Sequence, residues 1–128
     1  MADVLVLFGS KSDEAAYKQI LRILDNKKVS YDFKIASVHK TPKEIDIIFR
    51  KEYKVIIAGA GLAAALPGVA ASRTIKPVIG VPVSAKLNGM DALLSIAQMP
   101  KGVPVAAVGI DNAENAAHLA KRILDLKG

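Results

Sequence analysis

The sequence predicts an α/β fold, a three-layer sandwich in which helices cover both faces of a central parallel sheet. Short Val- and Ile-rich runs alternate along the chain with segments of helical periodicity, which is the pattern of repeated βα units. Hydrophobic residues make up 52% of the chain and aromatic residues only 5%, so aliphatic side chains must fill the core. No linker, repeat or low-complexity tract interrupts the pattern, and residues 1–128 are expected to form one domain.

Five strands are expected. The first is the apolar run Val4–Phe8, which stops at Gly9, and the second covers residues 31–37, where apolar and polar side chains alternate. The remaining strands are expected at residues 54–58, 77–81 and 104–108. Their right-handed connections favour the flavodoxin-like strand order 2-1-3-4-5.

Helices are expected between and after these strands, at residues 13–27, from residue 41 onward, and at residues 67–73, 89–98 and 112–126. The first and last place apolar residues on one face at helical spacing. The second has a strong start signal, with Thr41 as N-cap, Pro42 in the first turn and Glu44 completing a capping box.

Composition and charge exclude several classes of function. The formal net charge is +6, but the basic residues are spread along the chain without interleaved aromatic residues, so no nucleic-acid partner is expected. The chain has no cysteine, which excludes disulfides and thiolate chemistry, and its two histidines are too far apart to suggest a metal site. No apolar run approaches the roughly 20 residues that cross a bilayer, and no signal peptide is recognisable. A cytoplasmic protein without a membrane partner is expected.

Three unusual turns follow the first three strands, at residues 9–13, 37–41 and 58–61. Ligands of such sheets bind beyond the carboxyl ends of the strands, so the turns are expected to meet at one binding rim. The first turn suits a phosphate at a helix N-terminus, although Ser10 or Ser12 could simply cap that helix. In the second turn, His39 could transfer protons at neutral pH and Lys40 could hold a phosphate, or both could be ordinary surface residues.

The third segment, residues 58–68, consists almost entirely of small and apolar residues. It would let the backbone approach a ligand or another subunit closely, or it is a flexible connector. Residues 98–102 form either a helix stop or a flap over the site. His118 is expected on the exposed face of the last helix, without a role.

Five motifs follow one another along the chain: GSKSD at 9–13, SVHKTP at 37–42, AGAGLAAALPG at 58–68, PVIGVPV at 77–83 and LNGMDALLSIAQMPKGVPVA at 87–106. In this order and spacing they resemble the bacterial and archaeal carboxyaminoimidazole ribonucleotide mutase family, together with its aminoimidazole ribonucleotide carboxylase branch. The resemblance spans nearly the whole chain.

The resemblance implies a role for each matching residue of the first two turns. Ser10 and Ser12 match positions that hold a 5′-phosphate, and Asp13 matches one that binds ribose hydroxyls. Ser37 and Lys40 match further phosphate contacts, although the mutase branch usually has arginine where Lys40 stands.

Catalysis is implied for His39, which matches the family's catalytic histidine. Residues 59–66 resemble the loop that covers the imidazole and the carboxyl group, and residues 98–100 resemble a neighbouring flap. The positions of that loop expected to contact substrate are Gly59, Ala60, Gly61 and Leu66.

The implied reaction interconverts N5-carboxyaminoimidazole ribonucleotide and 4-carboxyaminoimidazole ribonucleotide in purine biosynthesis, through trapped carbon dioxide and without metal or organic cofactor. The family is typically a homo-octamer with sites at subunit contacts, so a homo-oligomer is expected. Family members commonly continue in a helical tail where this sequence ends at Gly128, which leaves octamer assembly open.

Alternatives to the mutase remain. Ala65 stands where mutases usually carry a histidine, and together with the His39-Lys40 pair it resembles the carboxylase branch, which takes up free carbon dioxide. A carboxylase acting on another nucleotide, such as a pyridine mononucleotide, is a second alternative. A non-enzymatic module that binds nucleotides, or nucleic acid through the basic surface, is a third.

Overall fold

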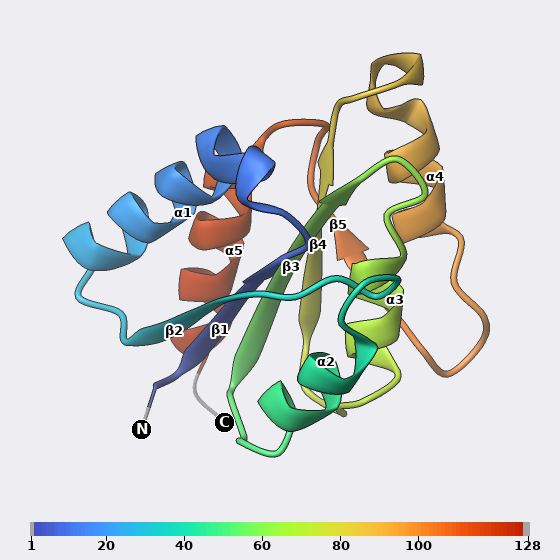
Figure 1. Cartoon of the computed structure of the whole chain (residues 1–128). Helices are drawn as coiled ribbons and strands as arrows, with labels where there is room; N and C mark the ends of the chain where they lie inside the picture. The colour runs from blue at the N-terminus through green and yellow to red at the C-terminus, as the bar shows by residue number, and fades with distance from the viewer. Residues whose placement is uncertain (1, 127–128) are drawn as a thin grey trace.

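The computed structural model describes residues 2–126, and its central sheet has five parallel strands in the order β2-β1-β3-β4-β5 (Figure 1). The predicted strand order is therefore confirmed. The strands are β1 (Val4–Phe8), β2 (Tyr31–Ile35), β3 (Val55–Gly61), β4 (Val78–Val83) and β5 (Ala106–Ala107).

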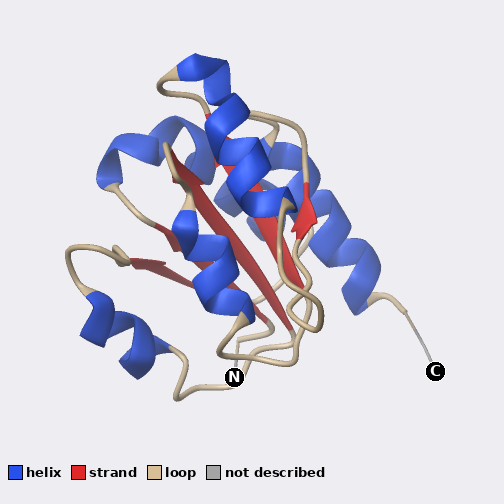
Figure 2. Cartoon of the chain, turned by 90° about the vertical axis from the view of Figure 1, so that its right-hand side faces the viewer, coloured by secondary structure: helices blue, strands red, loops and turns tan. Residues whose placement is uncertain are grey.

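Helices cover both faces of the sheet, as predicted. One face carries α1 (Glu14–Asn26) and α5 (Ala113–Leu124), and the other carries α2 (Pro42–Ile48), α3 (Ala65–Ala71) and α4 (Met90–Ala97) (Figures 1 and 2). Short 3-10 helices, η1 (Lys11–Asp13) and η2 (Leu87–Gly89), precede α1 and α4. No helix within residues 2–126 combines the length and the hydropathy needed to span a bilayer.

Alternating side chains of the central strands build two cores. Val4, Val6 and Phe8 of β1 pack toward α1 and α5, whereas Leu5 and Leu7 pack toward α2 and α3. All five are fully buried. Burying one such side chain contributes about 1.5–3 kcal/mol, so β1 anchors both layers and fixes where its carboxyl end points.

Four strands differ in length from their prediction: β2 ends at Ile35 instead of residue 37, β4 runs to Val83 instead of residue 81, and β3 and β5 differ most. β3 continues to Gly61 instead of stopping at residue 58, because Gly59, Ala60 and Gly61 pair with β4. The glycine-rich segment expected to be a turn therefore begins as strand. β5 is reduced to Ala106–Ala107. Among the described strands it pairs only with β4, because it lies at the edge of the sheet. The proline at 104 has no backbone N–H to extend that pairing toward the start of the strand.

The predicted capping box at the start of α2 is wrong. Thr41 is the N-cap residue, but its side chain makes no hydrogen bond to the helix. Its hydroxyl instead turns back toward Ser37, and only the backbone N–H of Glu44 bonds to the Thr41 carbonyl. Pro42 does occupy the first turn, as expected.

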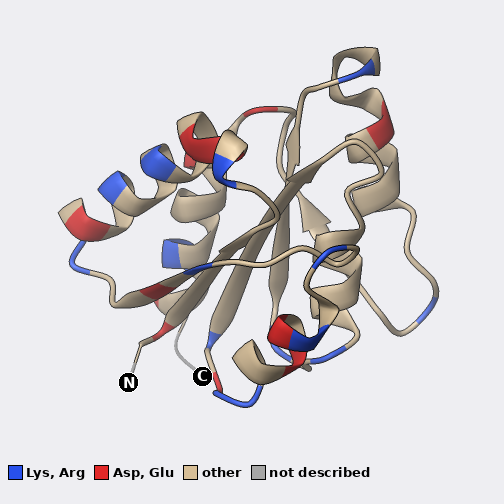
Figure 3. Ribbon diagram, in the orientation of Figure 1, with Lys and Arg blue, Asp and Glu red and all other residues tan. Residues whose placement is uncertain are grey.

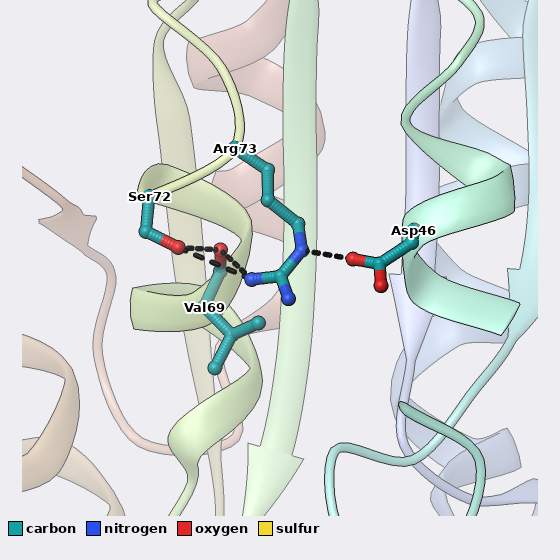
Figure 4. A network of polar contacts seen from close by, with 4 residues as sticks. All are labelled: Asp46, Val69, Ser72 and Arg73. Atoms are coloured by element: carbon teal, nitrogen blue, oxygen red, sulfur yellow. Dashed lines mark hydrogen bonds and ion pairs between the residues drawn. The ribbon is translucent and has the colours of Figure 1, made fainter. Parts of the chain in front are cut away.

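A polar bridge joins α2 and α3 on their shared face of the sheet. The Arg73 Nε donates to Asp46 Oδ1 at 2.6 Å, and Arg73 Nη1 also reaches the Val69 carbonyl and the Ser72 hydroxyl at 3.4 and 3.2 Å (Figure 4). Asp46 is exposed, so the ion pair stabilises the fold by roughly 0.2–1 kcal/mol. It links the helices at the edge opposite the predicted binding rim.

Candidate functional site

A hollow of about 450 Å³ lies beyond the carboxyl ends of β1, β2 and β3. Its walls come from the three segments that the sequence singled out: Gly9 to Asp13 without Lys11, residues 37–39, and residues 60–66. Ala85, just after β4, completes the lining. The prediction that these segments meet at one rim is confirmed, and the volume suits a small-molecule ligand.

Most of the predicted site residues line this hollow. They are Ser10, Ser12, Asp13, Ser37, His39, Ala60, Gly61 and Leu66. Lys40 does not line it: the residue is exposed one position beyond the wall. Gly59 is also outside, because it lies within β3 against the ring of Phe8.

Ala85 is the lining residue that lies outside the three segments predicted from the sequence. It has no chemistry of its own, and its only signal was its place just beyond the carboxyl end of a strand next to β3. Ligands of such sheets bind beyond the carboxyl ends of the strands, and this rule applies to Ala85 as it does to the other three segments.

The first turn presents two hydroxyls held against each other. Ser10 Oγ accepts the Ser12 N–H at 3.1 Å, and the two hydroxyl oxygens lie 2.8 Å apart. Each hydroxyl has a single proton, and one of the two protons is used between them. Whichever serine donates, one O–H remains for a ligand. The turn thus both caps η1 and offers a donor, so the two readings of these serines are compatible.

In the second turn, Ser37 likewise has a hydroxyl that can donate to a ligand. Its Oγ accepts the Lys40 N–H at 3.2 Å, which leaves the Ser37 hydroxyl proton for a ligand. Its backbone N–H is already bound by Thr41 Oγ1 at 2.8 Å. His39 lies at the middle of this turn, is exposed, and lines the hollow.

Asp13 is the acidic group of the site. It ends η1, is partly buried, and makes no side-chain hydrogen bond as the N-cap residue of α1. Burial raises the pKa of its carboxyl above the ordinary value. A carboxylate in this position can accept hydrogen bonds from ligand hydroxyls, which would repay part of its desolvation.

The hollow contains no Lys or Arg among its lining residues. Basic residues are spread over the whole molecule (Figure 3), and Lys11, Lys40 and Lys86 adjoin lining residues in the sequence without lining the hollow themselves. An anion in the hollow would therefore be held by serine hydroxyls and backbone N–H groups. Within residues 2–126, no group of three acidic or histidine side chains is placed to hold a metal ion.

A model of the family described as AIR carboxylase matches residues 3–128. The chain belongs to the AIR carboxylase family. This confirms the family expected from the five motifs. The match covers all three segments of the hollow.

Relatives within the AIR carboxylase family are similar over almost the whole chain. The N5-carboxyaminoimidazole ribonucleotide mutase of Pyrococcus abyssi is 50% identical over 132 residues, which cover 99% of this chain and 76% of the relative. The protein of that name from Methanocaldococcus jannaschii is 52% identical over 125 residues, covering 97% and 80%. The crystal structure of Treponema denticola PurE matches with a TM-score of 0.87 at 30% identity, covering 98% of this chain and 81% of that one.

Proposed function

We propose that this chain is an N5-carboxyaminoimidazole ribonucleotide mutase of purine biosynthesis. The supporting observation is that three segments line one hollow: the turn at residues 9–13, the turn at residues 37–39 and the small-residue segment 60–66. Relatives about 50% identical bear the mutase name. The serine hydroxyls of the hollow can donate to a phosphate, the Asp13 carboxylate can accept from ribose hydroxyls, and His39 can transfer protons. A reaction on such a ribonucleotide needs all three groups.

The phosphate of the ribonucleotide is held at one side of the hollow. The Ser10–Ser12 pair and Ser37 line the hollow from the turns after β1 and β2, and the pair and Ser37 each have one hydroxyl proton left for the phosphate. Hydrogen bonds to a charged group contribute about 1.5–3 kcal/mol each. Asp13, beside the serines, accepts from the ribose hydroxyls, and Lys40 adds long-range attraction from outside the wall.

The reaction moves a carboxyl group from the exocyclic nitrogen to a ring carbon. The carbamate C–N bond breaks, carbon dioxide is released into the hollow, and the nitrogen takes a proton from the His39 imidazolium. The electron-rich ring carbon then attacks carbon dioxide, and neutral His39 removes the proton from that carbon. The two proton transfers cancel, so no co-reactant is consumed. Such proton transfer typically contributes 10²–10⁴-fold to the rate.

Residues 60–66, the apolar wall of the hollow, retain the carbon dioxide. Residues 60–66 present only backbone, methyl groups and two leucine side chains to the hollow. A gas molecule held against the ring reacts as if intramolecular, which is worth about 7–11 kcal/mol when the geometry is right.

One observation favours the carboxylase branch as a second candidate. Ala65, the first residue of α3, lines the hollow with a methyl group at the position where mutases usually carry a histidine. A carboxylase would form the same product from aminoimidazole ribonucleotide and free carbon dioxide.

A single assay separates these candidates. Purified protein is given either the N5-carboxy nucleotide without bicarbonate or aminoimidazole ribonucleotide with excess bicarbonate, and formation of the 4-carboxy product is followed. Product from the first mixture, at a rate well above the spontaneous one, supports the mutase. Product from the second alone supports the carboxylase, and product from neither overturns both.

A cytoplasmic homo-oligomer, an octamer as in the family, is part of the same proposal. Three apolar side chains around the start of α4 are strongly exposed in the isolated chain: Leu87 at 73%, Met90 at 48% and Leu94 at 51%. Clustered exposed apolar residues are typical of interfaces. Analytical ultracentrifugation at several protein concentrations tests it, and a monomer at micromolar concentration would contradict it.

A further inference from the structure

We propose that Thr41 is a positioning residue. Its hydroxyl forms hydrogen bonds with Ser37, called the clasp below, that join the two ends of the turn 37–41 and so set the position of His39 in the hollow. The inference rests on the proposed function for its kinetic part, because His39 is the proton-transfer group only in that reaction. Thr41 itself lies outside the lining of the hollow, so it has no direct contact there.

The clasp consists of two side-chain hydrogen bonds to one residue. Thr41 Oγ1 accepts the Ser37 N–H at 2.8 Å and donates to the Ser37 carbonyl at 3.3 Å. The Thr41 N–H also bonds to that carbonyl, at 2.9 Å. The first and last residues of the turn are thus joined three times, and both hydrogen-bonding functions of the hydroxyl are used within the turn.

The sequence explains why the threonine hydroxyl points backward. Pro42 follows Thr41 and keeps it out of the helical region, and its φ and ψ are −135° and 55°. Proline at the first helical position still leaves the N–H groups of the second and third helical residues for a cap. Thr41 Oγ1 accepts the Ser37 N–H in their place, so the predicted capping box does not form.

His39 depends on this turn for its position. Its side chain is exposed and has no hydrogen bond or ion pair with any described residue, so only the backbone of residues 37–41 directs it into the hollow. A misplacement of about 1 Å at a reacting group can cost 10²-fold in rate. Ser37, at the other end of the clasp, faces the same hollow.

The decisive experiment compares Thr41→Val with Thr41→Ser, using Thr74→Val as the matched control. Thr74 also accepts a backbone N–H through its hydroxyl, that of Lys76 at 3.0 Å, but in the turn before β4, at the other end of the sheet. We expect kcat to fall at least 10-fold in Thr41→Val, with a smaller rise in KM. Thr41→Ser keeps the hydroxyl and should stay within about 3-fold of wild type, and Thr74→Val should retain wild-type kcat.

A second background shows whether the effect passes through His39. In His39→Asn, Thr41→Val should lower kcat by less than 2-fold, because residues that act together are not additive. Loss by the same factor in both backgrounds would show a general structural role and overturn the proposal. A folded Thr41→Val variant with kcat within 2-fold of wild type would overturn it too.

An activity-independent measurement keeps the geometric part testable if the wild type turns over neither nucleotide. Amide hydrogen exchange should be slowed at Ser37 in the wild type and in Thr41→Ser, and fast in Thr41→Val or, if that variant does not fold, in Thr41→Ala. Ring signals of His39 should shift in those variants while those of exposed His118 do not. Unprotected Ser37 in the wild type, or unchanged His39 signals, would overturn the clasp. An inactive wild type with these signatures present would overturn only the proposed function.

Discussion

The ring of Phe8 lies directly against Gly59 of the neighbouring strand. The two residues are paired across β1 and β3, and a methyl group at Gly59 would lie 2.8 Å from the Phe8 Cδ2 atom and closer still to Cε2 and Cζ. Phe8 is fully buried and also packs edge-on to Tyr17, with ring centroids 5.6 Å apart. Gly59 is therefore required by packing just below the hollow.

Gly59→Ala should destabilise the fold. The added methyl group has to displace a buried ring, and overpacking of this kind typically costs about 1–3 kcal/mol. Urea unfolding followed by circular dichroism measures the loss. Gly9→Ala is the control, since a methyl group there meets only the Ala60 Cβ, at 4.0 Å. Equal stability of the two variants would contradict this account of Gly59.

His39→Asn should lower kcat at least 10²-fold while the protein stays folded, because asparagine fills similar space but cannot exchange a proton at neutral pH. Steady-state assay with the better of the two candidate nucleotides measures this. His118→Asn, on the exposed face of α5, should leave kcat unchanged. Full turnover by His39→Asn would remove this residue from the mechanism.

The paired serines should separate binding from folding. Ser12→Ala leaves the Ser10 oxygen free to cap η1 and the Ser10 hydroxyl proton free for a ligand, so we expect little change in stability or KM. Ser10→Ala removes the cap and should cost about 0.5–2 kcal/mol in unfolding free energy. The double variant loses both hydroxyls, and its KM should rise roughly 10-fold, the equivalent of about 1.4 kcal/mol. Thermal unfolding and KM are measured on all three variants. A larger stability loss in Ser12→Ala would be inconsistent with the hydrogen bonds described.

Asp13 should make stability depend on pH. Burial raises the pKa of its carboxyl above 3.8, so the folded protein binds this proton more tightly than the unfolded chain does. Stability from this group is present below the unfolded pKa and decreases as pH rises through the folded pKa. Asp13→Asn should therefore be at least as stable as wild type at pH 7, with the difference disappearing below about pH 4.

Urea unfolding of both proteins between pH 3.5 and pH 7 tests this expectation. A variant that is less stable than wild type at pH 7 but equal to it at low pH would show that the carboxylate form is favoured in the folded state. The same variant should raise the KM for the ribonucleotide, since an amide is a weaker acceptor for ribose hydroxyls than a carboxylate.

Hydrophobic periodicity determined most of the fold. The apolar run at Val4–Phe8 defined β1 without error, since a fully buried strand leaves no position for a polar residue. Periodicity was less informative at β5, whose two residues are exposed at the sheet edge, and at β3, where glycine and alanine carry no periodic signal. Strand pairing, which no local pattern reports, set those two lengths.

The sequence alone determined the family, the strand order and which three segments carry chemistry, because motif order and buried periodicity are written in consecutive residues. The tertiary structure decided which side of each segment faces the hollow. Gly59, which packs under Phe8, and Lys40, which lies beyond the wall, are not among its lining residues. The tertiary structure also redirected the Thr41 hydroxyl from a helix cap to Ser37. These outcomes depend on backbone direction and on contacts between distant residues, which only the folded chain brings together.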